Sequence, residues 1–221
     1  MKTFNLLLFV LLVFALFTYS GCGDGYGTDN IVVDSLRYDG PQDRAPSNGT
    51  GFNTFAAYFP PQETQPYVGR RLEKVSFYLQ DIPTQTVVII YAEGTDGRTP
   101  GVERYSINLT QRIRNAGFYE HTITDAVIDI RENEGIWIAV ETDLPTDGFQ
   151  AIGCDDGTNY NPNGDRFLPP TGNTWTSFNE ITGSETINWN IRGFLAEEEC
   201  DNVVATTHFC TDARFARAAS P

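Results

Sequence analysis

The sequence predicts an all-β fold for the chain beyond its N-terminal segment, an antiparallel β-sandwich with jelly-roll-like connections. Short runs of β-branched and aromatic residues recur throughout, separated by Gly, Pro and Asn turn signals. No long window past the N-terminal segment has the 3.6-residue apolar period of an amphipathic helix. The chain also has no internal repeat, which argues against propellers and solenoids.

The N-terminal segment has the layout of a secretory signal. Lys2 precedes an apolar run over residues 4–17, which is shorter than the roughly 20 residues of a membrane span. Ser20 and Gly21 before Cys22 resemble the lipobox of bacterial lipoproteins, although Tyr19 stands where Leu is usual. We therefore expect cleavage after residue 21, acylation of Cys22 and anchoring by its acyl chains, at about 0.8 kcal/mol per buried CH2. The alternative is an ordinary signal peptide that leaves Cys22 a plain cysteine.

The expected organisation follows from composition. Residues 1–21 form the signal peptide, the Gly- and Asp-rich residues 22–30 a flexible tether, and residues 31–196 the sandwich domain. Residues 197–221 lose the strand pattern, and we expect a tail of uncertain order. The protein is predicted to be exported, to the outer membrane or cell surface as a lipoprotein or otherwise to the periplasm or medium.

Two strands are indicated most strongly. Residues 74–79 alternate, with Val75, Phe77 and Leu79 on one face. Residues 86–91 form a continuous β-branched run, which is typical of a strand covered on both sides. Further strands are predicted at residues 31–38, 52–59, 102–109, 117–123, 126–130, 135–141, 148–152, 174–178 and 187–195.

The charge of the chain excludes one class of partner. Removal of residues 1–21 removes one Lys and no acid, so the formal net charge changes from −14 to −15. Lys74 is then the one remaining lysine. Because nucleic-acid binding needs clustered Lys and Arg, we predict no nucleic-acid partner. The acidity indicates either a solvated surface or a partner that brings cations or hydroxyls.

The cysteines predict at most one disulfide. If Cys22 is acylated, three cysteines remain, and Cys200 and Cys210 are close enough in sequence for a short-loop disulfide. Cys154 would then be a free, buried thiol. Zinc is disfavoured because there is no CxxC motif and His208 is the one imidazole near the pair.

Several segments occur in a familiar order: 72–78, 88–94, 99–101, 135–140, 153–155, 164–165, 174–177 and 188–193. They resemble the jelly-roll-type β-sandwich accessory domains of secreted and surface proteins and peptidases of Gram-negative bacteria. The resemblance spans roughly residues 51–195. It implies a non-catalytic sandwich that serves attachment or binding.

Catalytic motifs are absent from the sequence. It contains no GxSxG elbow, no HExxH and no Gly-rich phosphate loop, and His121 lies in an alternating strand. We therefore predict no catalytic residue and no enzyme activity. A small hydrolase that uses two carboxylates remains an alternative, with Glu120, Glu141 and Asp165 as the candidates.

The loop over residues 155–165 concentrates oxygen ligands. Calcium ligands in this hypothesis are Asp155, Asp156, Asn159, Asn161, Asn163 and Asp165, with Gly164 in the place of the turn glycine. The bidentate Glu of calcium loops is missing, since Pro170 stands there. A plain Asn and Gly turn explains the same residues. Calcium is therefore a possible cofactor, and no other is predicted.

The same loop could bind a glycan, because sugars stack on aromatic rings and bond to Asp and Asn. The predicted ligand-binding residues are Trp175, Tyr160, Asp155, Asn161 and Asp165. Trp137 and Trp189 lie in core-like runs and are expected to be packing residues.

Three hypotheses for function follow. The first is a lipid-anchored, non-catalytic module for binding or adhesion at the cell surface, with a glycan or surface protein as ligand. The second is a structural spacer or a subunit of a surface complex. The third is the carboxylate-dependent hydrolase.

Overall fold

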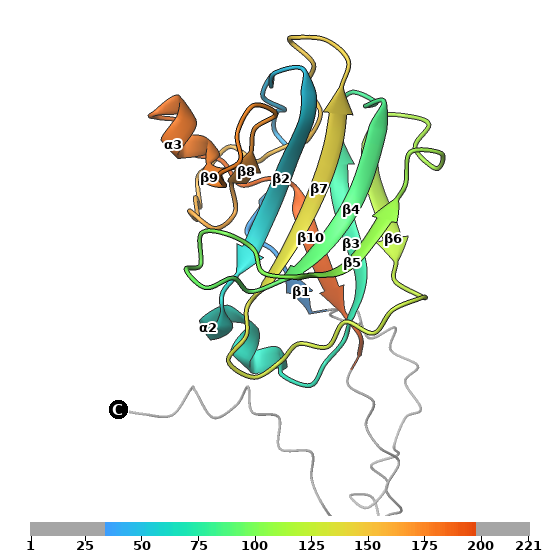
Figure 1. Cartoon of the computed structure of the whole chain (residues 1–221), viewed down its shortest axis with the longest axis vertical. Coiled ribbons are helices and arrows are strands. Elements are labelled where there is room, and N and C mark those ends of the chain that lie inside the picture. Colours follow the sequence, from blue (N-terminus) through green and yellow to red (C-terminus); the bar gives the residue numbers. More distant parts are fainter. Residues whose placement is uncertain (1–33, 198–221) are drawn as a thin grey trace, which may run out of the picture. The chain divides into compact units, whose positions relative to one another are not determined.

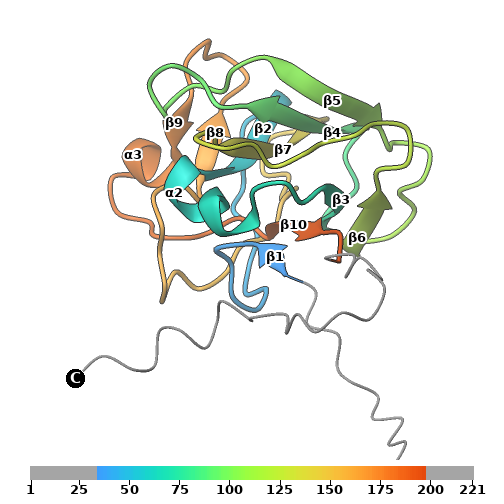
Figure 2. The same ribbon diagram turned by 90° about the horizontal axis from the view of Figure 1, so that it is seen from below.

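Two antiparallel sheets face each other in the part of the chain that the computed structural model describes, residues 34–197 (Figures 1 and 2). One sheet has the strand order β1 (Ser35–Leu36), β10 (Ile191–Leu195), β3 (Leu72–Leu79) and β6 (Gly117–Thr122). The other has the order β5 (Glu103–Asn108), β4 (Gln85–Ala92), β7 (Ile136–Leu144), β2 (Gly51–Phe59), β8 (Arg166–Leu168) and β9 (Thr176–Ser177). The predicted all-β antiparallel sandwich is confirmed.

Several predictions concern residues outside the described range. They are the signal peptide, the lipidation of Cys22, the tether, the Cys200–Cys210 disulfide and nearly all of the tail. Within residues 34–197, no helix is long and apolar enough to cross a membrane. Cys154 is a free, buried thiol, as predicted.

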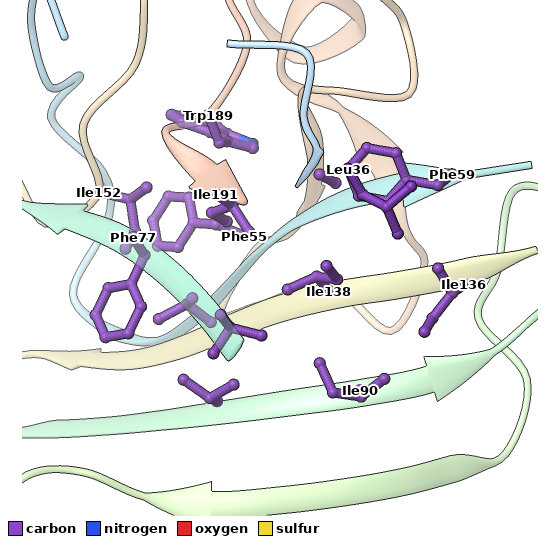
Figure 3. Packing of buried hydrophobic residues seen from close by; sticks show 14 of the residues in the cluster. Leu36, Phe55, Phe59, Phe77, Ile90, Ile136, Ile138, Ile152, Trp189 and Ile191 are labelled. Carbon is purple, nitrogen blue, oxygen red and sulfur yellow. The ribbon is translucent and has the colours of Figure 1, made fainter. Parts of the chain in front are cut away.

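The core lies between the sheets, where alternate residues of each strand point inward (Figure 3). Phe55 of β2, Ile138 of β7 and Phe77 of β3 are fully buried there. Trp189, two residues before the start of β10, meets Phe55 edge-on with ring centroids 5.0 Å apart. The predicted packing role of Trp189 is therefore confirmed.

Five predicted strands were wrong in extent. Residues 126–130 and 148–152 form only isolated bridges, at Asp129 and Ile152. Residues 187–195 form a strand only from Ile191. Of the predicted strands over residues 31–38 and 174–178, the structure has only Ser35–Leu36 and Thr176–Ser177 among the described residues. In the first three segments most apolar side chains are nevertheless buried, so their pattern predicted burial although the backbone forms no continuous ladder there.

Of the short strands at one edge of the larger sheet, β8 was not predicted, and β9 lies within the predicted strand over residues 174–178. Strand β8 has three residues, and β9 has two before the chain turns into the helix α3 (Phe178–Thr182). Ser177 and Glu180 form a capping box at the start of α3, which ends at Gly183 in the left-handed region (φ 75°). Another short helix, α2 (Pro61–Thr64), and the 3-10 turn η1 (Gln65–Tyr67) follow β2.

One arginine joins the two ends of the described chain. The Arg70 Nη1 atom contacts the Asp34 carboxylate, and its Nε and Nη2 atoms donate to the Ala196 carbonyl over 3.0 and 2.6 Å. Strand β1 pairs with β10 beside it. We call this the Arg70 clasp.

Candidate functional site

Asp155, the first residue of the predicted calcium loop, is a hydrogen-bond acceptor in the interior. It is 2% exposed. Its Oδ1 accepts from the backbone N–H groups of Gly157 (3.0 Å) and Asn188 (2.7 Å). Its Oδ2 accepts from Gly40 N (3.0 Å) and Asn188 Nδ2 (2.8 Å). Four N–H donors therefore use this carboxylate, and they tie three separate segments together.

Asn188 is the centre of the loop network, and the sequence did not single it out as a site residue. Its Nδ2 also donates to the carbonyl of Asn159 (3.1 Å), and its Oδ1 accepts from Asn161 N (2.9 Å). Gly164 lies so close that an added Cβ would be 2.4 Å from Asn188 Oδ1. A glycine is required there because any side chain would displace the amide.

Three further predicted calcium ligands also use their side chains in hydrogen bonds, and Asn159 takes part through its backbone carbonyl. Asp156 accepts from Thr158 N, and Asn161 Oδ1 accepts from Asn163 N, both over 2.9 Å. Asn163 Oδ1 accepts from Arg166 Nη2 (2.8 Å). Among residues 34–197, no group of three or more His, Cys, Asp or Glu side chains is placed to hold a metal ion. The geometry matches the alternative of an Asn and Gly turn, and calcium binding stays a prediction.

Asp165 differs from its neighbours because half of its carboxylate has no partner. The side chain is fully buried. Its Oδ2 accepts from Asn179 N (2.9 Å) and from the Tyr160 hydroxyl (3.3 Å), whereas Oδ1 has no hydrogen-bond partner in the structure. Burial raises the pKa of Asp165 to about 6. Tyr160 and Asp165 therefore meet, as the glycan hypothesis required, but Asp165 is closed off from solvent.

A second aromatic cluster lies on the outer face of the larger sheet, away from the sandwich core. Its buried members are Ala56, Tyr58, Ile89, Trp137 and Ala139, and Val87, Tyr91 and Trp175 pack against them half-buried. We call these eight residues the outer cluster. The sheet register places Tyr91, Trp137 and Tyr58 side by side on β4, β7 and β2. Trp175, the predicted ligand-binding residue, belongs to this cluster.

Trp137 forms the centre of the outer cluster. Its ring stacks on Tyr58 with centroids 4.7 Å apart and meets Trp175 edge-on at 5.4 Å. The guanidinium of Arg166 lies 5.8 Å from the Trp137 centroid. Trp137 is fully buried, as predicted, but it packs on the outer face and not in the sandwich core.

Polar atoms of this face lack partners. The Nε1 atom of Trp137 and the Nε atom of Arg166 are buried N–H donors without an acceptor in the structure. Glu141 projects from β7 on the same face, is half-buried, and makes no hydrogen bond or ion pair within the described residues. Desolvation raises its pKa. The face thus presents half-buried aromatic rings and one unused acceptor, whereas the two unpaired donors lie below its surface.

Burial also affects Tyr91, which lies at the rim of the cluster. Its pKa is raised to about 12 by desolvation and by the negative charges of Glu103 and Glu141. The phenol therefore stays protonated at neutral pH and is available as a hydrogen-bond donor.

Two of the three carboxylates of the hydrolase hypothesis, Glu120 and Glu141, are not brought together. Glu120 of β6 faces solvent on the outer face of the smaller sheet, where it pairs with Lys74 over 2.8 Å. Glu141 points outward from the other sheet. Packed sheets lie about 10 Å apart, so carboxylates on opposite outer faces exceed the roughly 5–10 Å that a glycosidase pair requires.

The imidazole of His121 is buried and contacts one side chain at each ring nitrogen. Its Nε2 atom lies 2.7 Å from the Tyr105 hydroxyl, and Nδ1 lies 3.3 Å from Arg112 Nη1. Because Arg112 can only donate, Nδ1 accepts and the Nε2–H group donates to Tyr105. Burial and the charge of Arg112 lower the pKa of His121.

Sequence reasoning identified Trp175 but missed Tyr58, Tyr91 and Arg166, which surround Trp137 together with it. The available signal was the continuous apolar run over residues 86–91. That run predicted cover on both sides, and the structure has Val88 and Ile90 in the sandwich core and Ile89 in the outer cluster.

No protein-family model, curated protein or solved structure matches the chain. The resemblance to sandwich accessory domains therefore stays a prediction.

Proposed function

We propose that the chain is an exported, lipid-anchored and non-catalytic binding module of the cell surface, and that the outer cluster is its ligand platform. The observation that carries this proposal is the half-buried pair Tyr91 and Trp175 around the buried Trp137, on the same face as the half-buried Glu141, which makes no hydrogen bond or ion pair within the described residues. Aromatic faces and a few convergent polar groups are the usual composition of a ligand site.

The polar groups favour a glycan. A ligand here meets a donor, the hydroxyl of the half-buried Tyr91, and an acceptor, the carboxylate of the half-buried Glu141. A hydroxyl both accepts and donates hydrogen bonds, so one type of ligand group serves both. The net charge of the mature chain and the unpaired Glu141 disfavour acidic sugars, and the ligand class is therefore a neutral saccharide.

The dimensions favour an oligosaccharide. Tyr91 lies opposite Trp137, and Glu141 is four residues further along β7, which at 3.3 Å per residue is about 13 Å. One sugar ring is too short to reach both Tyr91 and Glu141. Ala139 lies between Trp137 and Glu141, opposite Ala56 on β2, so the strand carries small side chains along the middle of this span.

Glycan-array binding of the mature chain, with Cys22 replaced by Ser, tests the proposal. We expect neutral oligosaccharides to bind, and we expect Trp175→Ala and Tyr91→Ala each to weaken binding roughly fivefold, since an aromatic contact contributes about 1 kcal/mol. Phe118→Ala is the matched control, because Phe118 is 46% exposed on the outer face of the smaller sheet.

Two outcomes contradict the proposal. A blank array with the folded chain excludes the glycan and leaves the protein-ligand or spacer hypotheses. Equal loss of binding in Phe118→Ala and Trp175→Ala places the ligand elsewhere than the outer cluster. Running the array with calcium and with chelator tests the predicted calcium requirement at the same time.

A further inference from the structure

Three polar side chains form a row inside the sandwich. Asn53 of β2 lies directly opposite Thr142 of β7, which lies directly opposite Thr86 of β4. They share the inward face with Phe55, Val140 and Val88, which are core residues. Asn53 and Thr142 are 0% exposed and Thr86 is 1% exposed.

Each member of this row has an oxygen without a hydrogen-bond partner in the structure: Asn53 Oδ1, Thr142 Oγ1 and Thr86 Oγ1. The orientation of the Asn53 amide is fixed, because its Nδ2 donates to the carbonyls of Gly49 (2.7 Å) and Gly51 (2.9 Å). Oδ1 is therefore the unpaired atom. Buried polar groups without a partner are rare because each costs the free energy of its desolvation.

The spacing of the row suits a bridge of water. Adjacent strands lie about 4.8 Å apart, and the facing oxygens of this row make no hydrogen bond to one another in the structure. A molecule that makes two hydrogen bonds of about 2.8 Å spans that separation. Its partners here are two hydroxyls, which donate or accept, and one amide oxygen, which only accepts.

We infer that the Asn53–Thr142–Thr86 row is a binding site for ordered internal water between the two sheets. The row contains no charged side chain, so its ligand is neutral and must both donate and accept. Water receives a hydrogen bond from a threonine hydroxyl and donates one to Asn53 Oδ1. The hydroxyl of the half-buried Thr110, which accepts from Thr86 N over 3.0 Å, lies next to the end of the row toward the surface.

Magnetic relaxation dispersion of water oxygen and deuterium, measured on the mature chain, tests this inference because it detects water that stays bound longer than the protein tumbles. We expect a dispersion step in the natural protein, its loss or reduction in Thr142→Val, and its retention in Thr142→Ser, which keeps the hydroxyl. Thr54→Val is the matched control, since Thr54 is the neighbouring buried threonine and faces the other side of β2.

An unchanged dispersion step in folded Thr142→Val overturns the inference, as does the absence of any step in the natural protein. If Thr142→Val does not fold, Thr86→Val at the end of the row replaces it, with the same expected reduction. A crystal structure provides the second readout. Water within hydrogen-bond distance of two of the three oxygens supports the site, and a dry row with the hydroxyls bonded to backbone overturns it.

Discussion

Replacement of Asp155 by Asn tests whether the loop over residues 155–165 is held by hydrogen bonds or by a metal ion. The substitution preserves shape but turns one carboxylate oxygen into an NH2 group. Each oxygen accepts from two N–H donors, so either orientation of the amide leaves two donors unpaired and facing another donor. Hydrogen bonds to a charged group contribute about 1.5–3 kcal/mol each, so we expect a loss of about 3–6 kcal/mol.

That loss is a large share of the roughly 5–15 kcal/mol that stabilises a typical domain. Urea unfolding followed by tryptophan fluorescence measures it. Asp156→Asn is the matched control. Asp156 is exposed and accepts only from Thr158 N, a bond that an amide oxygen also accepts, so we expect an unfolding midpoint close to that of the natural protein.

Repeating the titrations with calcium and with chelator separates the two hypotheses. The hydrogen-bond network predicts the same Asp155→Asn loss in both conditions. A calcium site predicts a natural protein that is more stable with calcium, and a loss that disappears in chelator. A loss below about 1 kcal/mol in both conditions refutes the reasoning from hydrogen bonds.

Three further predictions concern buried titratable groups. Because the pKa of Asp165 is raised to about 6 in the folded chain, the folded chain binds the proton of Asp165 more tightly than the unfolded chain does. The free energy of unfolding therefore falls as the pH rises from about 4 to about 6. Asp165→Asn should therefore gain up to about 3 kcal/mol over the natural protein at pH 7.5 but little at pH 4.5 in urea titrations, and no gain at pH 7.5 contradicts this. The lowered pKa of His121 has the opposite effect on stability. As the pH falls below 6.5, the ordinary pKa of histidine, His121 takes up a proton in the unfolded chain before it does so in the folded chain, and the free energy of unfolding therefore falls from pH 7.5 to 5.5. His121→Gln should lose this dependence, and a stability difference between the two proteins that does not vary with pH contradicts it. Burial raises the pKa of Cys154 to about 12, so iodoacetamide at pH 8 should modify its peptide only in urea, as mass mapping can show; modification of the folded protein contradicts this.

The long strands could be predicted because each carries a pattern that only one arrangement satisfies. The alternation of Val75, Phe77 and Leu79 matches one buried face of β3, and the unbroken run of β4 matches cover on both faces. The same kind of apolar pattern led to a wrong strand prediction for residues 126–130, where Ile128 and Ile130 lie in the core but the backbone is irregular. Alternation reports burial, and ladder pairing also needs a neighbouring strand.

The short elements and the site were harder for a related reason. Strand β8 has three residues, too few to show a period. It nevertheless brings Arg166 beside Ala56 and close to Trp137. Which strands become neighbours depends on topology, so the outer cluster could not be assembled from sequence. The S-x-x-E pattern of Ser177 and Glu180, by contrast, was a readable helix start.

The Arg70 clasp has a mechanical consequence for the proposed anchoring. A module held to a membrane by the proposed tether and to a ligand at its outer cluster would be pulled under flow, and the force would enter the described chain at Asp34. Strand β1 has only two residues paired with β10, and those pairs would open one after another if the strand were peeled away. Arg70 contacts the Asp34 carboxylate and the Ala196 carbonyl at once, so tension on the incoming chain would be shared with the outgoing chain. In such a module the clasp would be the first contact to resist the pull.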